Sequence, residues 1–113
     1  MTRLLALQGA DIICLPNAGE GREKGCFWES ILRTRAIDNQ VHIVAAVNGG
    51  RAMIVSPAGY ILASSGKTKP GLAVAELNLS ETMVNSAGQK VKGVYDKARR
   101  ADTYGLLARH IWD

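Results

Sequence analysis

Apolar and polar positions follow one another in blocks that predict helices and strands in turn. Residues 2–8 carry a helical pattern that stops at Gly9, a residue suited to the left-handed conformation that ends many helices. A continuous apolar run over 12–15 then predicts a strand buried on both faces. From 27 to 39 the apolar positions recur at helical spacing, and Glu29 is placed to pair with Arg33 one turn later. These blocks predict helix, strand and helix in succession.

The following blocks are short and mostly apolar, which is typical of strands. Residues 41–47 are nearly all apolar and give the clearest strand pattern of the chain. Residues 51–64 predict a hairpin, because the turn-forming sequence Ser-Pro-Ala-Gly separates two apolar runs. A further strand is expected over 72–77, and Ser80 is placed to cap a helix that begins at Glu81. This order of elements favours a layered α/β fold.

Composition and charge exclude several classes of protein. The 113 residues suffice for one domain, and 47% hydrophobic against 21% charged residues is a globular composition. No apolar run approaches the roughly 20 residues of a membrane span, and no secretion signal is recognisable, so we expect a cytoplasmic protein with no membrane partner. The net charge of +4 is spread along the chain without a clustered basic patch, so no nucleic-acid partner is expected.

Two cysteines and two histidines are the candidates for thiol or metal chemistry. Cys14 lies within an apolar run and is expected to be a small core residue. Cys26 follows Lys24 and precedes a predicted helix, and both features favour a thiolate. The base of such a thiol enzyme would be His42 or His110, so a Cys26–His42 pair is one functional hypothesis. The spacings match no metal site, and we expect no metal and no organic cofactor.

The loop after the first predicted strand is a candidate for a pocket. Loops that leave the carboxyl ends of strands are where α/β proteins place ligands. Asn17 offers an amide group, and Gly19 and Gly21 let the backbone approach a ligand closely. The turn at 48–50 would lie at the same edge of the sheet if the two strands run parallel. The loop lacks the lysine and serine of a phosphate-binding loop and is not expected to cradle a nucleotide.

Four stretches together resemble the carbon–nitrogen hydrolases, the nitrilase superfamily. The first is similar to a family helix that ends in Gly-Ala-Asp and leads to a buried strand and a Pro-containing loop. The second resembles a helix end of the form Arg-Ala-x-Glu/Asp-Asn, and the third resembles the hairpin S-x-I-x-x-P-x-G-x-x-L-A. The fourth resembles the tail RRP-x-x-YG-x-L, with Ala101 in place of proline. In chain order, the stretches are residues 3–17, 33–39, 51–63 and 99–107.

The resemblance implies an α-β-β-α sandwich and a hydrolase of amides, nitriles or N-carbamoyl compounds. Such enzymes use a Cys nucleophile, a Glu base and a Lys that stabilises the tetrahedral oxyanion. In the family all three precede the helix that ends here at Gly9, so neither Cys14 nor Cys26 inherits the catalytic role. We therefore expect no catalytic residue in this chain, which resembles the C-terminal part of the enzyme, and we expect it to be inactive alone.

The resemblance also implies supporting roles and a division of the chain. Asn17 and Ala18 match the loop that lines the family's pocket, so they are the expected substrate-pocket residues. Residues 1–80 are expected to form a partial hydrolase domain and residues 81–113 a C-terminal extension. The family dimerises through the face that carries the first two helices, which predicts a homodimer or a higher homo-oligomer. The parent enzyme would act on a small molecule, and the alternative is a non-catalytic interaction module of the same fold.

Overall fold

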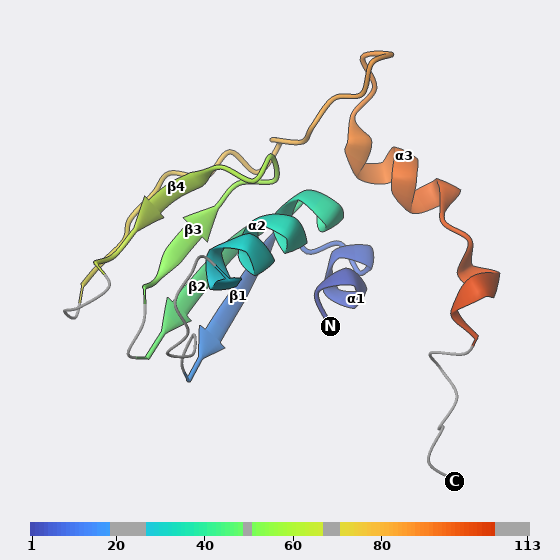
Figure 1. Cartoon of the computed structure of the whole chain (residues 1–113). Helices are drawn as coiled ribbons and strands as arrows, with labels where there is room; N and C mark the ends of the chain where they lie inside the picture. Colours follow the sequence, from blue (N-terminus) through green and yellow to red (C-terminus); the bar gives the residue numbers. More distant parts are fainter. Residues whose placement is uncertain (19–26, 49–50, 67–70, 106–113) are drawn as a thin grey trace, which may run out of the picture.

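A four-stranded sheet with one long helix across its face forms the centre of the molecule (Figure 1). The structure is a computed structural model and describes residues 1–18, 27–48, 51–66 and 71–105. In chain order its elements are α1 (Thr2–Leu7), β1 (Ile12–Asn17), α2 (Phe27–Asn39), β2 (His42–Val47), β3 (Met53–Val55), β4 (Ile61–Ser64), α3 (Val91–Ala98) and the 3-10 helix η1 (Ala101–Tyr104).

The first half of the chain forms a parallel β-α-β unit. β1 pairs in parallel with β2, so that Ile12 lies opposite His42 and Asn17 opposite Val47. Parallel strands require a crossover connection, and α2 forms the helix of that connection. Its bounds are those that the helical periodicity predicts, and the left-handed Gly9, at φ +98°, follows the end of α1. The predicted succession of helix, strand, helix and strand is confirmed.

The predicted hairpin is also confirmed, and its turn is tied to α2. β3 pairs antiparallel with both β2 and β4, which gives the sheet order β1-β2-β3-β4. Gly59 closes the turn at φ +81°, a conformation that favours glycine, and its N–H donates to Ser56 O at 2.8 Å. Arg33 Nε of α2 donates to Gly59 O at 2.7 Å. The turn therefore docks on the helix as well as connecting two strands.

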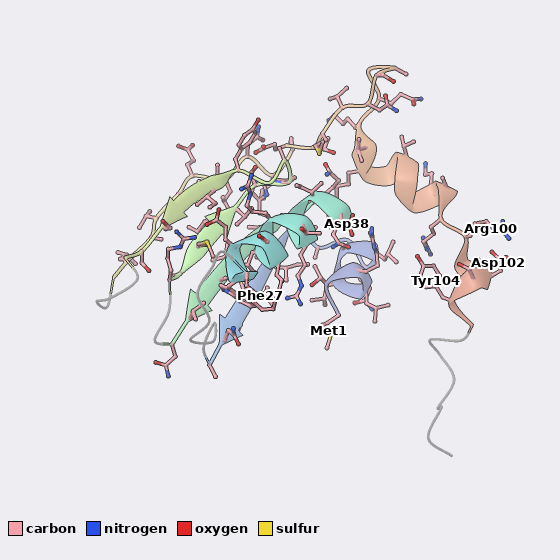
Figure 2. The ribbon with its side chains drawn as sticks, viewed as in Figure 1. Met1, Phe27, Asp38, Arg100, Asp102 and Tyr104 are labelled. Atoms are coloured by element: carbon pink, nitrogen blue, oxygen red, sulfur yellow. The ribbon has the colours of Figure 1, made fainter. Side chains whose placement is uncertain are left out.

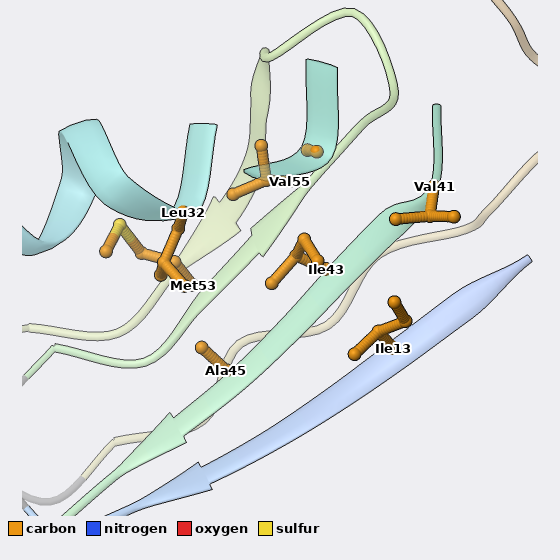
Figure 3. Close-up of a cluster of buried hydrophobic side chains, with 8 residues drawn as sticks. Ile13, Leu32, Val41, Ile43, Ala45, Met53 and Val55 are labelled. Carbon is orange, nitrogen blue, oxygen red and sulfur yellow. The ribbon is translucent and has the colours of Figure 1, made fainter. Parts of the chain in front are cut away.

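One apolar core joins α2 to the sheet. Leu32 and Ala36 project from α2 into this core and are fully buried, and Leu32 shares it with Met53 of β3 (Figure 3). Strand side chains alternate between the two faces of a sheet, so every second strand residue meets the helix. The other members of the core cluster are Ile13, Val41, Ile43, Ala45 and Val55.

The opposite face of the sheet is open along β1. Ile12 and Cys14 alternate with the core residue Ile13 and point away from α2; Ile12 is 38% exposed and Cys14 is exposed. The prediction that this strand is buried on both faces is wrong, and so is the core role of Cys14. The physical reason is that α2, the helix packed on the sheet, covers the face that carries Ile13 and not the face that carries Ile12 and Cys14.

Residues 71–90 also differ from the prediction. No strand forms over 72–77, where Leu72 is 84% and Val74 75% exposed, and no hydrogen-bonded ladder joins this segment to the described sheet. No helix begins at Glu81. Ser80 N–H instead donates to Asn78 Oδ1 at 3.1 Å, so an asparagine-centred turn replaces the expected helix cap.

The last described elements extend away from the sheet (Figure 1). α3 is kinked at Gly93, whose φ is +90°. At the start of η1 the guanidinium of Arg100 donates twice to Asp102, at 2.9 and 2.6 Å, and holds the pKa of that carboxyl below its usual range (Figure 2). In the part of the chain that the structure describes, no helix is long and apolar enough to cross a membrane.

Candidate functional site

The carboxyl ends of β1 and β2 lie side by side, as the sequence predicts for parallel strands. The Asn48 N–H donates to Asn17 O at 2.9 Å, which joins the ends of the two strands. Asn17 is half-buried and Ala18 is exposed at this edge. Residues 19–26 and 49–50, which include the loop glycines, lie outside the described residues. The pocket role of Asn17 and Ala18 stays a prediction.

An ion-pair network fixes the first turn of α2 near the same edge. Arg51 Nη2 donates to Glu29 Oε2, and Glu29 Oε1 lies 3.6 Å from Arg33 Nη1. The predicted Glu29–Arg33 pair is thus present, and Arg51 adds a second cation from the segment before β3. The side chains of Glu29 and Arg51 are only 25% and 20% exposed, so salt screens this pair less than a surface pair.

A cavity of about 280 Å³ lies at the opposite edge of the sheet, where the strands begin. One wall comes from Arg3 in the first turn of α1 and from the end of α2, and the other comes from the turn after residue 82 and the start of α3. It is therefore separate from the edge that carries Asn17. The residues that line it are Arg3, Ile37, Asp38, Asn39, Gln40, Met83, Val84, Asn85, Val91 and Lys92.

Four titratable side chains lie near the start of β1 and β2, and one of them, Lys92, also lines the cavity. His42 is 1% exposed, and its Nε2 lies 3.6 Å from Glu81 Oε2 without a hydrogen-bond partner among the described residues. Asp11 precedes β1 and forms an ion pair with Lys92. The hydrogen bond and the charge of Lys92 hold the pKa of Asp11 below its usual range. Cys26 lies outside the described residues, so the Cys26–His42 hypothesis stays untested.

Gln40 is a residue that the sequence analysis missed. It is buried at φ +51°, and its Nε2 donates to Ile37 O at 2.7 Å and to Pro57 O at 3.2 Å. Its Oε1 accepts hydrogen bonds from Met83 N–H at 2.8 Å and from Thr82 Oγ1 at 3.1 Å. A polar residue between two largely apolar elements was the only hint of this role in the sequence. The sequence does not indicate its partners, because they lie up to 43 residues away along the chain.

A family model and several named proteins are similar in sequence to most of the chain. Residues 1–84 match the family model described as carbon-nitrogen hydrolase. Deaminated glutathione amidase of Synechocystis sp. (strain PCC 6803 / GT-S) is 38% identical over 86 residues, which cover 67% of this chain and 31% of the relative. The enzyme of that name from Rattus norvegicus is 35% identical over 113 residues, which cover 91% of this chain and 33% of the relative.

Solved structures match as well. A mutant of the amidase from Nesterenkonia sp. AN1, solved with the acetamide moiety of fluoroacetamide added at its active-site cysteine, has a TM-score of 0.69 at 27% identity. The match covers 92% of this chain and 37% of that chain. This chain spans about a third of the length of the two curated relatives. The predicted fold class is confirmed, and the chain belongs to the carbon–nitrogen hydrolase family.

Proposed function

We propose that this chain forms the C-terminal part of the catalytic domain of an amidase-type carbon–nitrogen hydrolase. The observation that carries the proposal is the family match over residues 1–84 in a chain that spans about a third of its curated relatives. In the parent enzyme a Glu-Lys-Cys triad hydrolyses the amide. By the family pattern this triad precedes the helix that ends at Gly9.

The open face of β1 supports this proposal. Ile12 and Cys14 are apolar or weakly polar side chains, yet they are exposed on a sheet whose other face packs against α2. In a layered sandwich each sheet buries one face against helices and the other against a further layer. A second sheet from the remainder of the parent enzyme would cover this face.

We propose a small-molecule amide as the substrate, because the similar proteins are named as amidases. Asn17 and Ala18 would line its pocket at the carboxyl edge of β1. In a form with a complete triad, Asn17→Ala is expected to raise KM about tenfold, the effect of one lost hydrogen bond to substrate. Steady-state kinetics test this, and an unchanged KM would remove Asn17 from the pocket. Asn48→Ala, at the neighbouring strand end, is the matched comparison.

The purified 113-residue chain is expected to hydrolyse amides no faster than buffer does. The physical reason is that neither Cys14 nor Cys26 is placed by the family pattern as the nucleophile. The measurement is ammonia release from short aliphatic amides, with and without prior treatment with iodoacetamide. Turnover that the thiol reagent abolishes would refute the proposal. An in-frame coding sequence upstream of Met1 with Glu, Lys and Cys in that order would identify the parent enzyme.

A non-catalytic interaction module of the same fold is the second candidate. Exposed apolar side chains on the first two helices favour it, because Leu4 of α1 and Phe27 of α2 are each 62% exposed. Figure 2 labels Phe27 on α2. The proposed partner is a second copy of the chain, giving a homodimer or a higher homo-oligomer. Size-exclusion chromatography tests this candidate. A folded oligomer of defined size supports it, whereas aggregation or disorder contradicts it.

A further inference from the structure

Residues 72–77, here called the unpaired segment, have the sequence of a strand but no partner strand. The sequence of the segment, Leu-Ala-Val-Ala-Glu-Leu, is apolar except for its glutamate. It runs as an extended trace between β4 and α3 (Figure 1). Among the described residues, no backbone N–H or C=O of this segment makes a hydrogen bond to another backbone group. A strand-forming sequence therefore keeps its backbone donors and acceptors available to a partner.

Exposure alternates along the unpaired segment with the period of a strand. The even-numbered side chains are exposed, with Leu72 at 84% and Val74 at 75%, and the odd-numbered side chains are half-buried. Successive side chains of a β-strand point to opposite faces in this way. Strands that are apolar on both faces occur where both faces are covered, as in the interior of a layered fold. The described part of this chain covers only one face of the segment.

The unpaired segment lies within the family domain. The family match covers residues 1–84 and so includes it, whereas the chain spans about a third of the length of its two curated relatives. Under the proposed function, the rest of the domain is upstream, and the open face of β1 awaits a second layer. That second layer needs strands, and the unpaired segment is a strand-like segment without a neighbour.

We propose that the unpaired segment pairs with a strand from the upstream part of the parent enzyme and becomes a strand of the second sheet. This inference rests on the proposed function. Backbone hydrogen bonds would hold the added strand, and the alternation of side chains between the two faces would set its register. Two copies of the chain paired through this segment would form only a two-stranded ribbon, which is marginally stable in water. An upstream strand is therefore the better occupant.

Amide hydrogen exchange of the full 113-residue chain and of a chimera tests the proposal. The chimera joins the upstream part of the Synechocystis deaminated glutathione amidase to this chain. In the chain alone, the amides of the unpaired segment are expected to exchange near their intrinsic rates, while those of β2 are protected. In the chimera, alternate amides of the segment are expected to gain roughly a hundredfold in protection, because every second N–H of a strand points to the same edge.

The outcomes separate this proposal from the proposed function. A chimera that hydrolyses amides but leaves the unpaired segment unprotected overturns the proposal and leaves the proposed function standing. Protection that is already present in the chain alone also overturns it, and protection that rises with concentration identifies a second copy as the occupant. If the chimera does not fold, the chain is mixed with the separately purified upstream part. An unprotected segment in that mixture contradicts the proposal.

Two proline variants, Ala73→Pro and Val74→Pro, assign the pairing to backbone groups. Proline removes the N–H but is compatible with extended backbone, and neighbouring N–H groups of a strand point to opposite edges. At least one variant is therefore expected to lower the denaturation midpoint of the chimera. In the chain alone neither is expected to change the midpoint, because the segment has no backbone ladder to lose. Chimera midpoints that neither proline changes would contradict the proposal.

Discussion

A chimera that joins the upstream part of the Synechocystis deaminated glutathione amidase to this chain is expected to hydrolyse amides, whereas this chain alone is not. The upstream part would add the Glu, the Lys and the Cys, together with a layer for the open face of β1. Loss of a catalytic nucleophile costs an enzyme on the order of a millionfold in kcat. The gain over the isolated chain is therefore expected to span several orders of magnitude in ammonia release.

Two controls separate this gain from other causes. The same chimera with its upstream nucleophilic Cys changed to Ala is expected to fold and to be inactive. The upstream part alone is expected to be inactive as well, because it lacks β1 and the helix α2 that packs on it. A chimera that has the circular dichroism of a folded α/β protein but no activity would count against the assignment.

Leu32→Ala is expected to lower the free energy of unfolding by about 3 kcal/mol. Leu32 is fully buried between α2 and the sheet, in the core cluster that also contains Met53 (Figure 3). Truncation removes the transfer free energy of the buried atoms and leaves a cavity that the neighbouring side chains fill only in part. Urea denaturation followed by circular dichroism measures the change.

The matched control for this substitution is Thr34→Ala. Thr34 lies on the same helix but is exposed, so its replacement is expected to change the free energy of unfolding by less than about 0.5 kcal/mol. Equal denaturation midpoints for the Leu32 and Thr34 variants would contradict the placement of α2 on the sheet. A lower midpoint for the Leu32 variant alone is the expected result.

Much of the fold is predictable because its central elements carry their own periodicity. The helix over 27–39 and the strand at 41–47 have local patterns strong enough to place them within one residue. The strand predicted at 72–77 fails because a strand exists only with a partner, which an alternating pattern cannot supply. The helix expected at Glu81 fails because the side chain of Asn78 competes for a neighbouring backbone group.

The candidate site is predictable only in part, for a similar reason. Asn17 and Asn48 lie in contact because β1 and β2 run parallel and end at the same edge of the sheet. The order of elements in the sequence predicts this arrangement. The contacts of Gln40 with Thr82 and of His42 with Glu81 join residues about 40 positions apart. Residue type does not reveal such pairs, because they depend on where the chain returns after the hairpin.

Peptide mass spectrometry of the chimera after treatment with fluoroacetamide tests the central claim most directly. In the Nesterenkonia amidase mutant, the acetamide moiety of this reagent adds to the active-site cysteine. If this chain is the C-terminal part of such an enzyme, the adduct is expected at the upstream cysteine, with Cys14 and Cys26 unmodified. An adduct at Cys14 or Cys26 in place of the upstream cysteine would contradict the assignment.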